Sequence, residues 1–123
     1  MMRLGTDLIE INRIQHAIER SERFHTRVYT SQEIAYCESK HKGMYQSYAG
    51  IYAAKEAFLK ALGTGLRYGS WQDIEVGHTD LGAPKLYITG PFREILDSQG
   101  LSKIIISISH CKDYAMSTVI LKG

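Results

Sequence analysis

Residues 45–62, YQSYAGIYAAKEAFLKAL, form the strongest helical segment of the sequence, and Gly63 follows in the position where helices commonly end. At about 100° per residue, alanine, aromatic and aliphatic side chains cover nearly every direction around the axis of this segment. A helix that is apolar on all sides is normally buried. We therefore predict a buried central helix over Tyr45–Leu62.

Three charged residues interrupt this apolar helix: Lys55, Glu56 and Lys60. Glu56 and Lys60 are four residues apart and share one stripe, whereas Lys55 points about 100° away. If the stripe is exposed, an ion pair at this spacing explains the charges and adds about 0.3–0.5 kcal/mol. If it is buried, an unpaired carboxylate is costly, so Glu56 needs a cation or a bound ligand. The helix alone leaves both interpretations open.

A second carboxylate, Asp7, lies at the end of the first predicted strand, Leu4–Ile9. A carboxylate there is out of place unless it is paired or metal-bound, or unless it caps the helix that follows. Two carboxylates from different elements, with no Cys or His cluster nearby, suit a hard cation such as Mg²⁺. Asp7 and Glu56 are therefore the candidate metal ligands.

The other predicted elements divide the chain into a helical first half and a strand-rich second half. Apolar residues at helical spacing predict a helix over residues 10–22, and the capping-box spacing of Thr30 and Glu33 predicts another over 30–39. The chain of 123 residues fits one domain, so we predict a single α+β domain over residues 1–123. The remaining elements are strands at 73–76, 85–89, 103–109 and 114–121 and a short helix from Pro91 that Gly100 ends.

Composition is that of a soluble globular protein, with 44% hydrophobic and 23% charged residues. The net charge of +2 is too small to demand a polyanionic partner. No apolar run approaches the roughly 20 residues that span a bilayer, and no signal-type segment is visible. The cysteines Cys37 and Cys111 lack close paired spacing, so we predict free thiols, a cytoplasmic location and no membrane partner.

Two further segments carry candidate binding residues. The corner Gly63-Thr64-Gly65 is not a Walker-type loop and by itself is a helix cap and turn, although Lys60 lies one turn earlier and can direct its charge at a phosphate there. His110 sits where the strand 103–109 turns, a position in which a lone histidine is more often structural or solvated than catalytic.

Arginines form a basic stripe on the first predicted helix. Arg13, Arg20 and Arg23 lie within about an 80° sector of an ideal helix. Such a stripe is usually a solvated face, but it can also dock an acidic surface and speed encounter. One alternative function is therefore a non-catalytic module that binds RNA or another polyanion, and a second is a structural oligomer. Neither gives a reason for Glu56 in a buried helix.

Taken together, three motifs resemble the holo-acyl-carrier-protein synthase family of phosphopantetheinyl transferases. The central motif is specific to the family, whereas each of the other two would be weak evidence by itself. The likeness covers nearly the whole chain in the right order. The motifs are Gly5–Glu10 with Arg13-Ile14, Ala53–Gly65, and Ser107–His110, and further matches are Phe24, Arg27–Thr30, Glu33, Asp73–Val76 and Gly82–Pro84.

The resemblance implies a 4′-phosphopantetheinyl transferase fold, in which helices pack on a small, mainly antiparallel sheet. It further implies a homotrimer with coenzyme A sites at the subunit interfaces. The implied reaction moves 4′-phosphopantetheine from coenzyme A to a serine of apo-acyl-carrier protein, gives holo-acyl-carrier protein and 3′,5′-ADP, and supports fatty acid biosynthesis. The implied partners are coenzyme A and the carrier protein, not nucleic acid.

The family's functional positions map onto this sequence residue by residue. Asp7 and Glu56 match the Mg²⁺ ligands and, with Lys60, the catalytic group. The matches to the coenzyme A site are Lys60, Gly63, Thr64, Gly65, Pro84, Ser109 and His110, and the matches to the carrier-binding helix are Arg13, Arg20 and Arg23.

Two residues depart from the family pattern. Ile51 stands where members often carry arginine, and Ala83 stands where lysine or arginine is usual. Neither change touches the expected metal ligands. We therefore expect an altered affinity for the nucleotide phosphates of coenzyme A.

Overall fold

The long central helix predicted from the sequence is present as α4 (Met44–Leu62), in a computed structural model that describes residues 1–123. It ends at Gly63, whose φ of 84° lies in the left-handed region and whose N–H donates to the Leu59 carbonyl at 2.8 Å. None of the helices is both long enough and apolar enough to cross a membrane. The other elements are β1 (Met2–Glu10), α1 (Ile11–Arg20), α2 (Glu22–Val28), α3 (Ser31–Glu38), β2 (Ile74–His78), β3 (Pro84–Ile88), α5 (Gly90–Ser98), β4 (Lys103–His110) and β5 (Tyr114–Lys122), with 3₁₀ turns η1 (His41–Gly43) and η2 (Trp71–Asp73).

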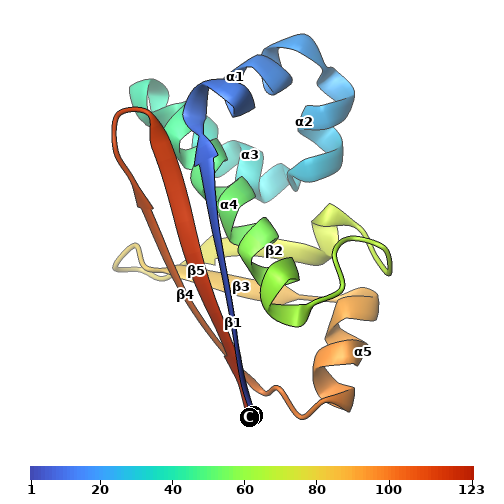
Figure 1. The fold of residues 1–123 in the computed structure, drawn as a ribbon. Coiled ribbons are helices and arrows are strands. Elements are labelled where there is room, and N and C mark those ends of the chain that lie inside the picture. Colours follow the sequence, from blue (N-terminus) through green and yellow to red (C-terminus); the bar gives the residue numbers. More distant parts are fainter.

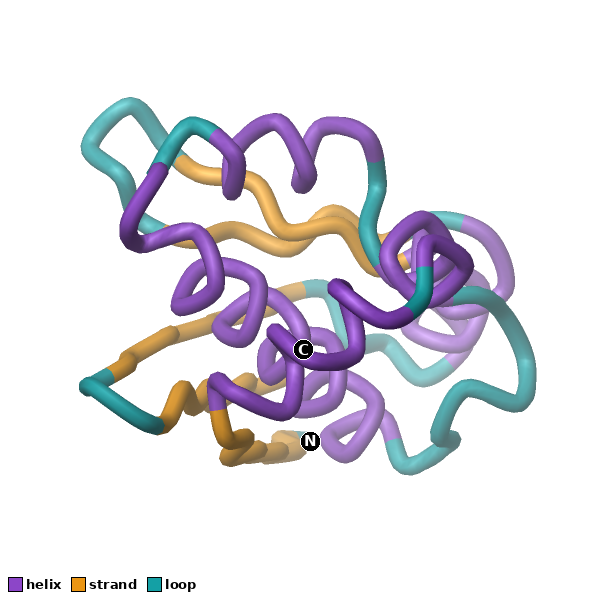
Figure 2. Tube along the Cα trace, turned by 90° about the horizontal axis from the view of Figure 1, so that it is seen from above, coloured by secondary structure: helices purple, strands orange, loops and turns teal.

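Helix α4 lies between two antiparallel sheets (Figures 1 and 2). One is a three-stranded sheet with the order β1-β5-β4, and the other is the hairpin β2–β3. Helices α1, α2 and α3 gather at one end of α4, and α5 lies near its other end (Figure 1). The predicted α+β class with a mainly antiparallel sheet is confirmed.

The backbone of α4 lies directly on strand β1. A side chain at Gly5 would overlap the Ala57 carbonyl, so only glycine permits this approach. Val119 and Leu121 of β5 add fully buried side chains to the same interface, because every second residue of the strand faces α4. The close approach brings β1 beside the C-terminal half of α4.

The opposite face of the three-stranded sheet has no covering element and is apolar. Leu4 and Leu8 of β1 are each 64% exposed, and Leu8 pairs with Met116 of β5, which is 40% exposed. Ile105 of β4 and Tyr114 of β5 extend this outer face. Uncovered apolar area of this extent on a soluble protein usually marks an interaction surface.

The first predicted helix, 10–22, is wrong at its end, because the chain breaks at Ser21. Ser21 has an extended backbone, and its hydroxyl accepts a hydrogen bond from the Phe24 N–H at 3.1 Å, which caps a new helix, α2. Arg23 therefore lies on α2, and only Arg13 and Arg20 share the face of α1. The helical periodicity continues across the break, which is why the sequence pattern did not reveal it.

Asp7 lies in the middle of β1, so the predicted position at the end of the first strand is wrong. The strand continues to Glu10, which is the N-cap residue of α1 and makes no side-chain cap hydrogen bond. Asp7 therefore does not cap α1. Another role must account for a carboxylate on the inner side of this strand.

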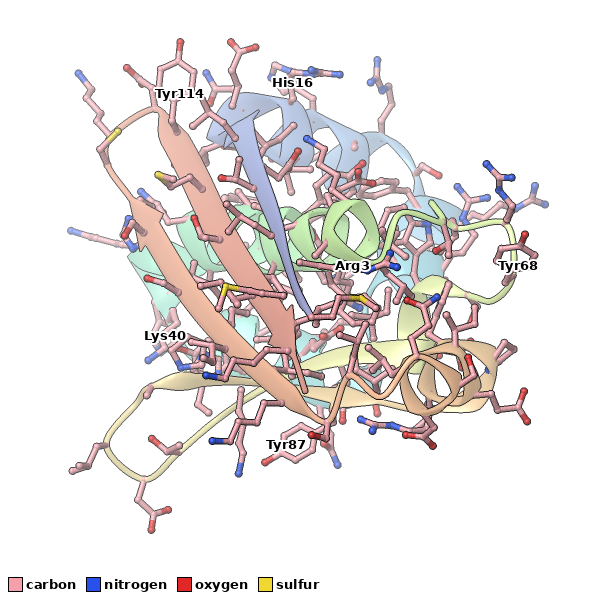
Figure 3. The ribbon with its side chains drawn as sticks, turned by 60° about the horizontal axis from the view of Figure 1, so that its bottom comes forward. Arg3, His16, Lys40, Tyr68, Tyr87 and Tyr114 are labelled. Atoms are coloured by element: carbon pink, nitrogen blue, oxygen red, sulfur yellow. The ribbon has the colours of Figure 1, made fainter.

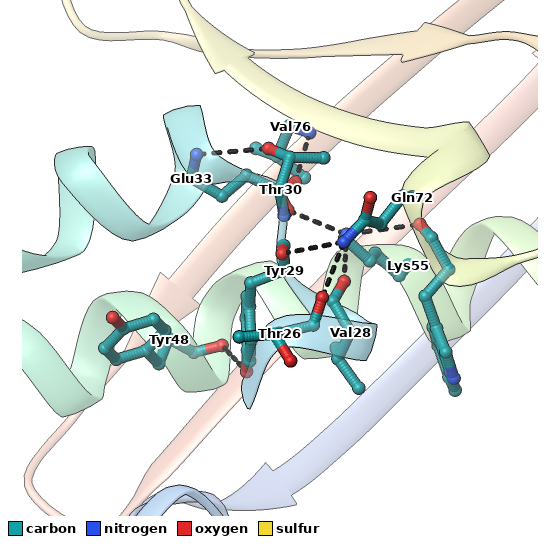
Figure 4. Close-up of polar contacts among 10 residues, drawn as sticks. Thr26, Val28, Tyr29, Thr30, Glu33, Tyr48, Lys55, Gln72 and Val76 are labelled. Atoms are coloured by element: carbon teal, nitrogen blue, oxygen red, sulfur yellow. Dashed lines mark hydrogen bonds and ion pairs between the residues drawn. The ribbon is translucent and has the colours of Figure 1, made fainter. Parts of the chain in front are cut away.

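The fully buried charge of α4 is Lys55, not Glu56. Its side chain has no exposed area, and Nζ donates to Glu33 Oε1 at 2.7 Å and to the carbonyls of Val28 at 2.6 Å and Trp71 at 3.2 Å (Figure 4). Burial lowers the pKa of Lys55, and the Glu33 carboxylate partly offsets this. Three acceptors thus compensate the buried ammonium group.

Glu33 is itself fully bonded. Its Oε2 accepts from the Val76 N–H of β2 at 2.7 Å, and its Oε1 also accepts from the Thr30 N–H at 2.9 Å. The Thr30 hydroxyl completes the predicted capping box by accepting from the Glu33 N–H. One carboxylate therefore joins α3, α4 and β2.

Lys55→Met should destabilise the protein by about 3–5 kcal/mol, because it leaves the Glu33 carboxylate buried without its cation. Lys42→Met is the control, since Lys42 is exposed and makes no ion pair. Urea unfolding followed by circular dichroism measures both variants. Equal stability of the two variants would show that the buried pair does not hold α4 in place.

Candidate active site

Asp7 of β1 and Lys60 of α4 form the first contact of the site. Lys60 Nζ donates to Asp7 Oδ1 at 3.0 Å and to the Thr6 carbonyl at 3.1 Å. The Asp7 side chain is only 13% exposed, whereas that of Lys60 is 53% exposed. Lys60 thus covers the solvent side of a mostly buried carboxylate.

Glu56 belongs to the same electrostatic site. Its pKa is raised mainly by burial and then by the negative charge of Asp7, and Lys60 partly offsets both effects. Two carboxylates repel each other in this way only when they are close. The expected i,i+4 ion pair of Glu56 with Lys60 is not formed, because Lys60 bonds Asp7 instead.

The donor set of these residues fits Mg²⁺. Asp7 and Glu56 offer hard carboxylate oxygens, and no group of three or more His, Cys, Asp or Glu residues is available to form a full protein cage. Mg²⁺ typically binds through one or two carboxylates and completes its octahedron with water and substrate phosphate. A divalent cation would also relieve the repulsion that raises the Glu56 pKa.

A hollow of about 310 Å³ opens beside these groups, and we call it the carboxylate hollow. Gly63 and Gly65, both at positive φ, turn the chain around its edge, and the predicted residues Lys60, Gly63 and Gly65 all lie here. Thr64 does not: it faces a separate hollow next to α5. The residues that line the carboxylate hollow are Glu56, Leu59, Lys60, Gly63, Gly65 and Leu66.

The predicted residues Pro84 and His110 lie in a second hollow, which we call the histidine hollow. Its volume of about 170 Å³ is below the roughly 300–1,000 Å³ of sites that enclose a drug-sized ligand. Ser109 does not line it and instead lies beside Met116 on the outer face of the sheet. The lining residues are Tyr36, Gln46, Ser47, Gly50, Ile51, His78, Gly82, Pro84, Ile108 and His110.

The two hollows lie on opposite sides of α4. On an ideal helix the residues of α4 that line one hollow point roughly 160° away from those that line the other. Asp7 and His110 also belong to β1 and β4, the two edge strands of the sheet. In Figure 3, Lys40, near the histidine hollow, and Tyr68, in the loop after α4, project from opposite sides of the molecule. The predicted site is therefore divided into two half-sites in one copy of the chain.

Several residues of these half-sites were not found from the sequence. Tyr52 lies near both carboxylates, since burial, Glu56 and Asp7 raise its pKa while Arg13 opposes them. Arg13 thus lies close enough to Tyr52 to affect its charge balance, and Arg13, Arg20 and Arg23 are all exposed on α1 and α2. In the histidine hollow, His78 was missed because it lies beyond the predicted strand 73–76, and only the structure shows that it pairs with Pro84 across β2–β3.

A small α+β fold with a carboxylate pair, a lysine and a glycine corner fits the class of enzymes that hold a divalent cation against a phosphate ester. The family model of the 4′-phosphopantetheinyl transferase superfamily matches residues 3–119. The chain belongs to this superfamily. The alternative of a non-catalytic RNA-binding module is not supported.

Individual relatives agree over almost the whole chain. The chain is 45% identical to a holo-[acyl-carrier-protein] synthase of Ruminiclostridium cellulolyticum, covering 98% of this chain and 91% of that protein. Its fold matches the synthase of Neisseria meningitidis with a TM-score of 0.88 and 31% identity, covering 98% of both chains. The Helicobacter pylori synthase in complex with coenzyme A gives a TM-score of 0.84 and 30% identity, covering 97% of this chain and 99% of that chain.

Glu56→Gln should raise the melting temperature at pH 7 in the presence of a chelator. The folded-state pKa of Glu56 lies above its unfolded value, so its stabilising contribution is lost as the pH rises through that pKa. Mg²⁺ should raise the melting temperature of the wild type and not that of the variant. Thermal unfolding with chelator and with millimolar Mg²⁺ measures both effects.

Glu94→Gln, on the exposed face of α5, is the matched control and should keep the response to Mg²⁺. A Glu56→Gln protein that melts lower than the wild type and keeps the full Mg²⁺ response would contradict the assignment of Glu56 as a ligand.

Proposed function

We propose that this chain is a holo-[acyl-carrier-protein] synthase, which transfers 4′-phosphopantetheine from coenzyme A to a serine of apo-acyl-carrier protein. The observation that carries the proposal is the carboxylate pair Asp7 and Glu56 beside Lys60, in a chain that belongs to the transferase superfamily. The names of its relatives and the coenzyme A complex of one of them support the same activity.

The reaction joins the serine oxygen to the β-phosphorus of coenzyme A, breaks the phosphorus–oxygen bond to the α-phosphate, and releases 3′,5′-ADP. Asp7 and Glu56 would hold Mg²⁺, which when bound neutralises charge on the diphosphate. Lys60 already reaches over Asp7, so its ammonium group lies where it can contact a phosphate oxygen. The serine proton would pass to Glu56 directly or to a water bound at the metal. Most of the rate gain would come from positioning and electrostatics.

The divided site is the reason to propose assembly. Coenzyme A carries a diphosphate and a nucleotide, and the carboxylate hollow suits the first while the histidine hollow suits the second. Because these hollows lie on opposite sides of α4, we propose that each complete site combines the carboxylate hollow of one copy with the histidine hollow of its neighbour. In a closed ring of copies, every half-site meets the complementary half-site of a neighbouring copy.

The outer face of the three-stranded sheet is the proposed contact in a homotrimer. Leu4, Leu8 and Met116 supply an exposed apolar surface at its centre. Burial of such a surface between copies is the usual driving force of association. The number of copies follows from resemblance to the family, and the apolar face supports association itself.

The carrier protein is proposed to dock beside the carboxylate hollow. Arg13, Arg20 and Arg23 are exposed on α1 and α2 and suit an acidic surface, which raises the encounter rate. The modified carrier would serve fatty acid biosynthesis. Cys37 and Cys111 are both free thiols, which fits a reducing cytoplasm.

Incubation of the protein with coenzyme A, Mg²⁺ and apo-acyl-carrier protein should add one phosphopantetheine mass to the carrier. Asp7→Ala or Glu56→Ala should lower the rate by about 100-fold or more, because each removes a metal ligand. Mass spectrometry of the carrier follows the reaction, and Glu94→Gln is the control. A folded wild-type protein that leaves the carrier unmodified would refute the proposed function.

Two inactive variants should restore each other if the site is shared between copies. In mixed oligomers of Glu56→Ala and His110→Ala chains, about one quarter of the sites in any closed ring receive both intact halves. Co-expression and the transfer assay measure this recovery. A mixture of Asp7→Ala with Glu56→Ala should recover nothing, because both changes lie in the same half. Absence of recovery in the first mixture would show that one copy builds the whole site.

A further inference from the structure

The histidine hollow has an unusual electrical character. Its lining contains no lysine, arginine, aspartate or glutamate, and Ile51 of α4 forms part of the wall. Its only residues with an ionisable imidazole are His78 at the end of β2 and His110 at the end of β4. Any positive charge in the lining must therefore come from these imidazoles.

His78 is held in a fixed position by its neighbours. Its ring stacks on Tyr36 of α3 with the centroids 3.9 Å apart and the planes 12° from parallel. Lys40 Nζ lies 4.7 Å from the centroid of the same tyrosine ring, and the backbone of His78 pairs with Pro84. A half-buried imidazole in such a stack is preorganised to contact a ligand in the hollow.

The groups around His78 favour an anion. Tyr36 and Lys40 face it from α3 and the residues just after it, and His110 shares the hollow from β4. Burial and then the charge of Lys40 lower the pKa of His78, so the imidazole is neutral in the empty hollow at neutral pH. A phosphate placed here would reverse that balance, because the opposite charge favours the protonated ring.

We infer that His78, together with His110, binds the 3′-phosphate of the coenzyme A nucleotide and takes up a proton when it does so. This inference rests on the proposed function. The 3′-phosphate is the fitting group because the diphosphate of the same molecule belongs to the carboxylate hollow with Lys60. With Ile51 in the wall and no permanent cation in the lining, the phosphate depends on the histidines for its charge partner.

The affinity for the 3′-phosphate should fall as the pH rises. When binding takes up one proton, affinity is highest below the pKa of the free imidazole and falls as pH rises, by up to about tenfold per pH unit. The second ionisation of the phosphate near pH 6 acts in the opposite direction and is the same for every variant. The difference in slope between the wild type and a variant with a permanent cation therefore isolates the histidine.

Isothermal titration calorimetry of the full chain with 3′,5′-ADP and with 5′-AMP, from pH 6 to pH 8, tests the inference. These probes differ only in the 3′-phosphate. His78→Arg should bind 3′,5′-ADP with a flat or rising affinity, whereas the wild type should lose at least about fivefold relative to it across this range. His78→Gln should bind more weakly at pH 6 and approach the wild type at pH 8.

Proton uptake gives an independent readout. For the wild type, the binding enthalpy of 3′,5′-ADP should vary with the ionisation enthalpy of the buffer, and for His78→Arg this dependence should fall. His16→Gln, an exposed change on α1, should behave as the wild type. In turnover, His78→Gln should raise KM for coenzyme A and leave kcat unchanged.

A wild-type pH slope retained in His78→Gln, or an equal slope with 5′-AMP, would overturn the inference. The wild-type transfer assay separates this failure from that of the proposed function. If the wild type is active and its pH response does not depend on His78, only the role of His78 is refuted. If the wild type is inactive, the proposed function is refuted.

Discussion

The buried ion pair of Lys55 with Glu33 fixes the orientation of the central helix. A charged side chain with no exposed area is tolerated only because the Glu33 carboxylate and two carbonyls surround it. These partners come from α3, from the residue that ends α2 and from η2, so α4 cannot rotate without breaking several hydrogen bonds. Glu56 follows Lys55 by about 100° around the helix, and the buried pair therefore also decides that Glu56 turns toward Asp7.

The candidate site holds a carboxylate where the surrounding core favours an uncharged side chain. Burial and Asp7 both disfavour the charged form of Glu56, yet the apolar helix keeps it in place. Sites that await a cation commonly carry such local instability, which the rest of the fold tolerates. Here the stable part is the core around α4, and the destabilised group is Glu56 of α4, which faces Asp7 of the edge strand β1.

The division of the site follows from the position of α4. This helix lies between the three-stranded sheet and the β2–β3 hairpin, and the two hollows open on opposite sides of it. Two features support the proposed association with a second copy. One is the uncovered apolar face of the sheet, and the other is the pair of half-sites on opposite sides of α4. Association would complete the active site and cover the sheet in the same step.

The sequence by itself determined the central helix and the α+β class and singled out Asp7 and Glu56 as candidate ligands, because periodicity, the Gly63 end signal and charges among apolar residues are local patterns. It did not reveal the partner of Lys55, since Glu33 is 22 positions away and was visible only as part of a capping box. The break at Ser21, the separation of Pro84 and His110 from Glu56, and the place of His78 were likewise decided by the tertiary structure. Each depends on which distant segments pack together, and no spacing along the chain records that.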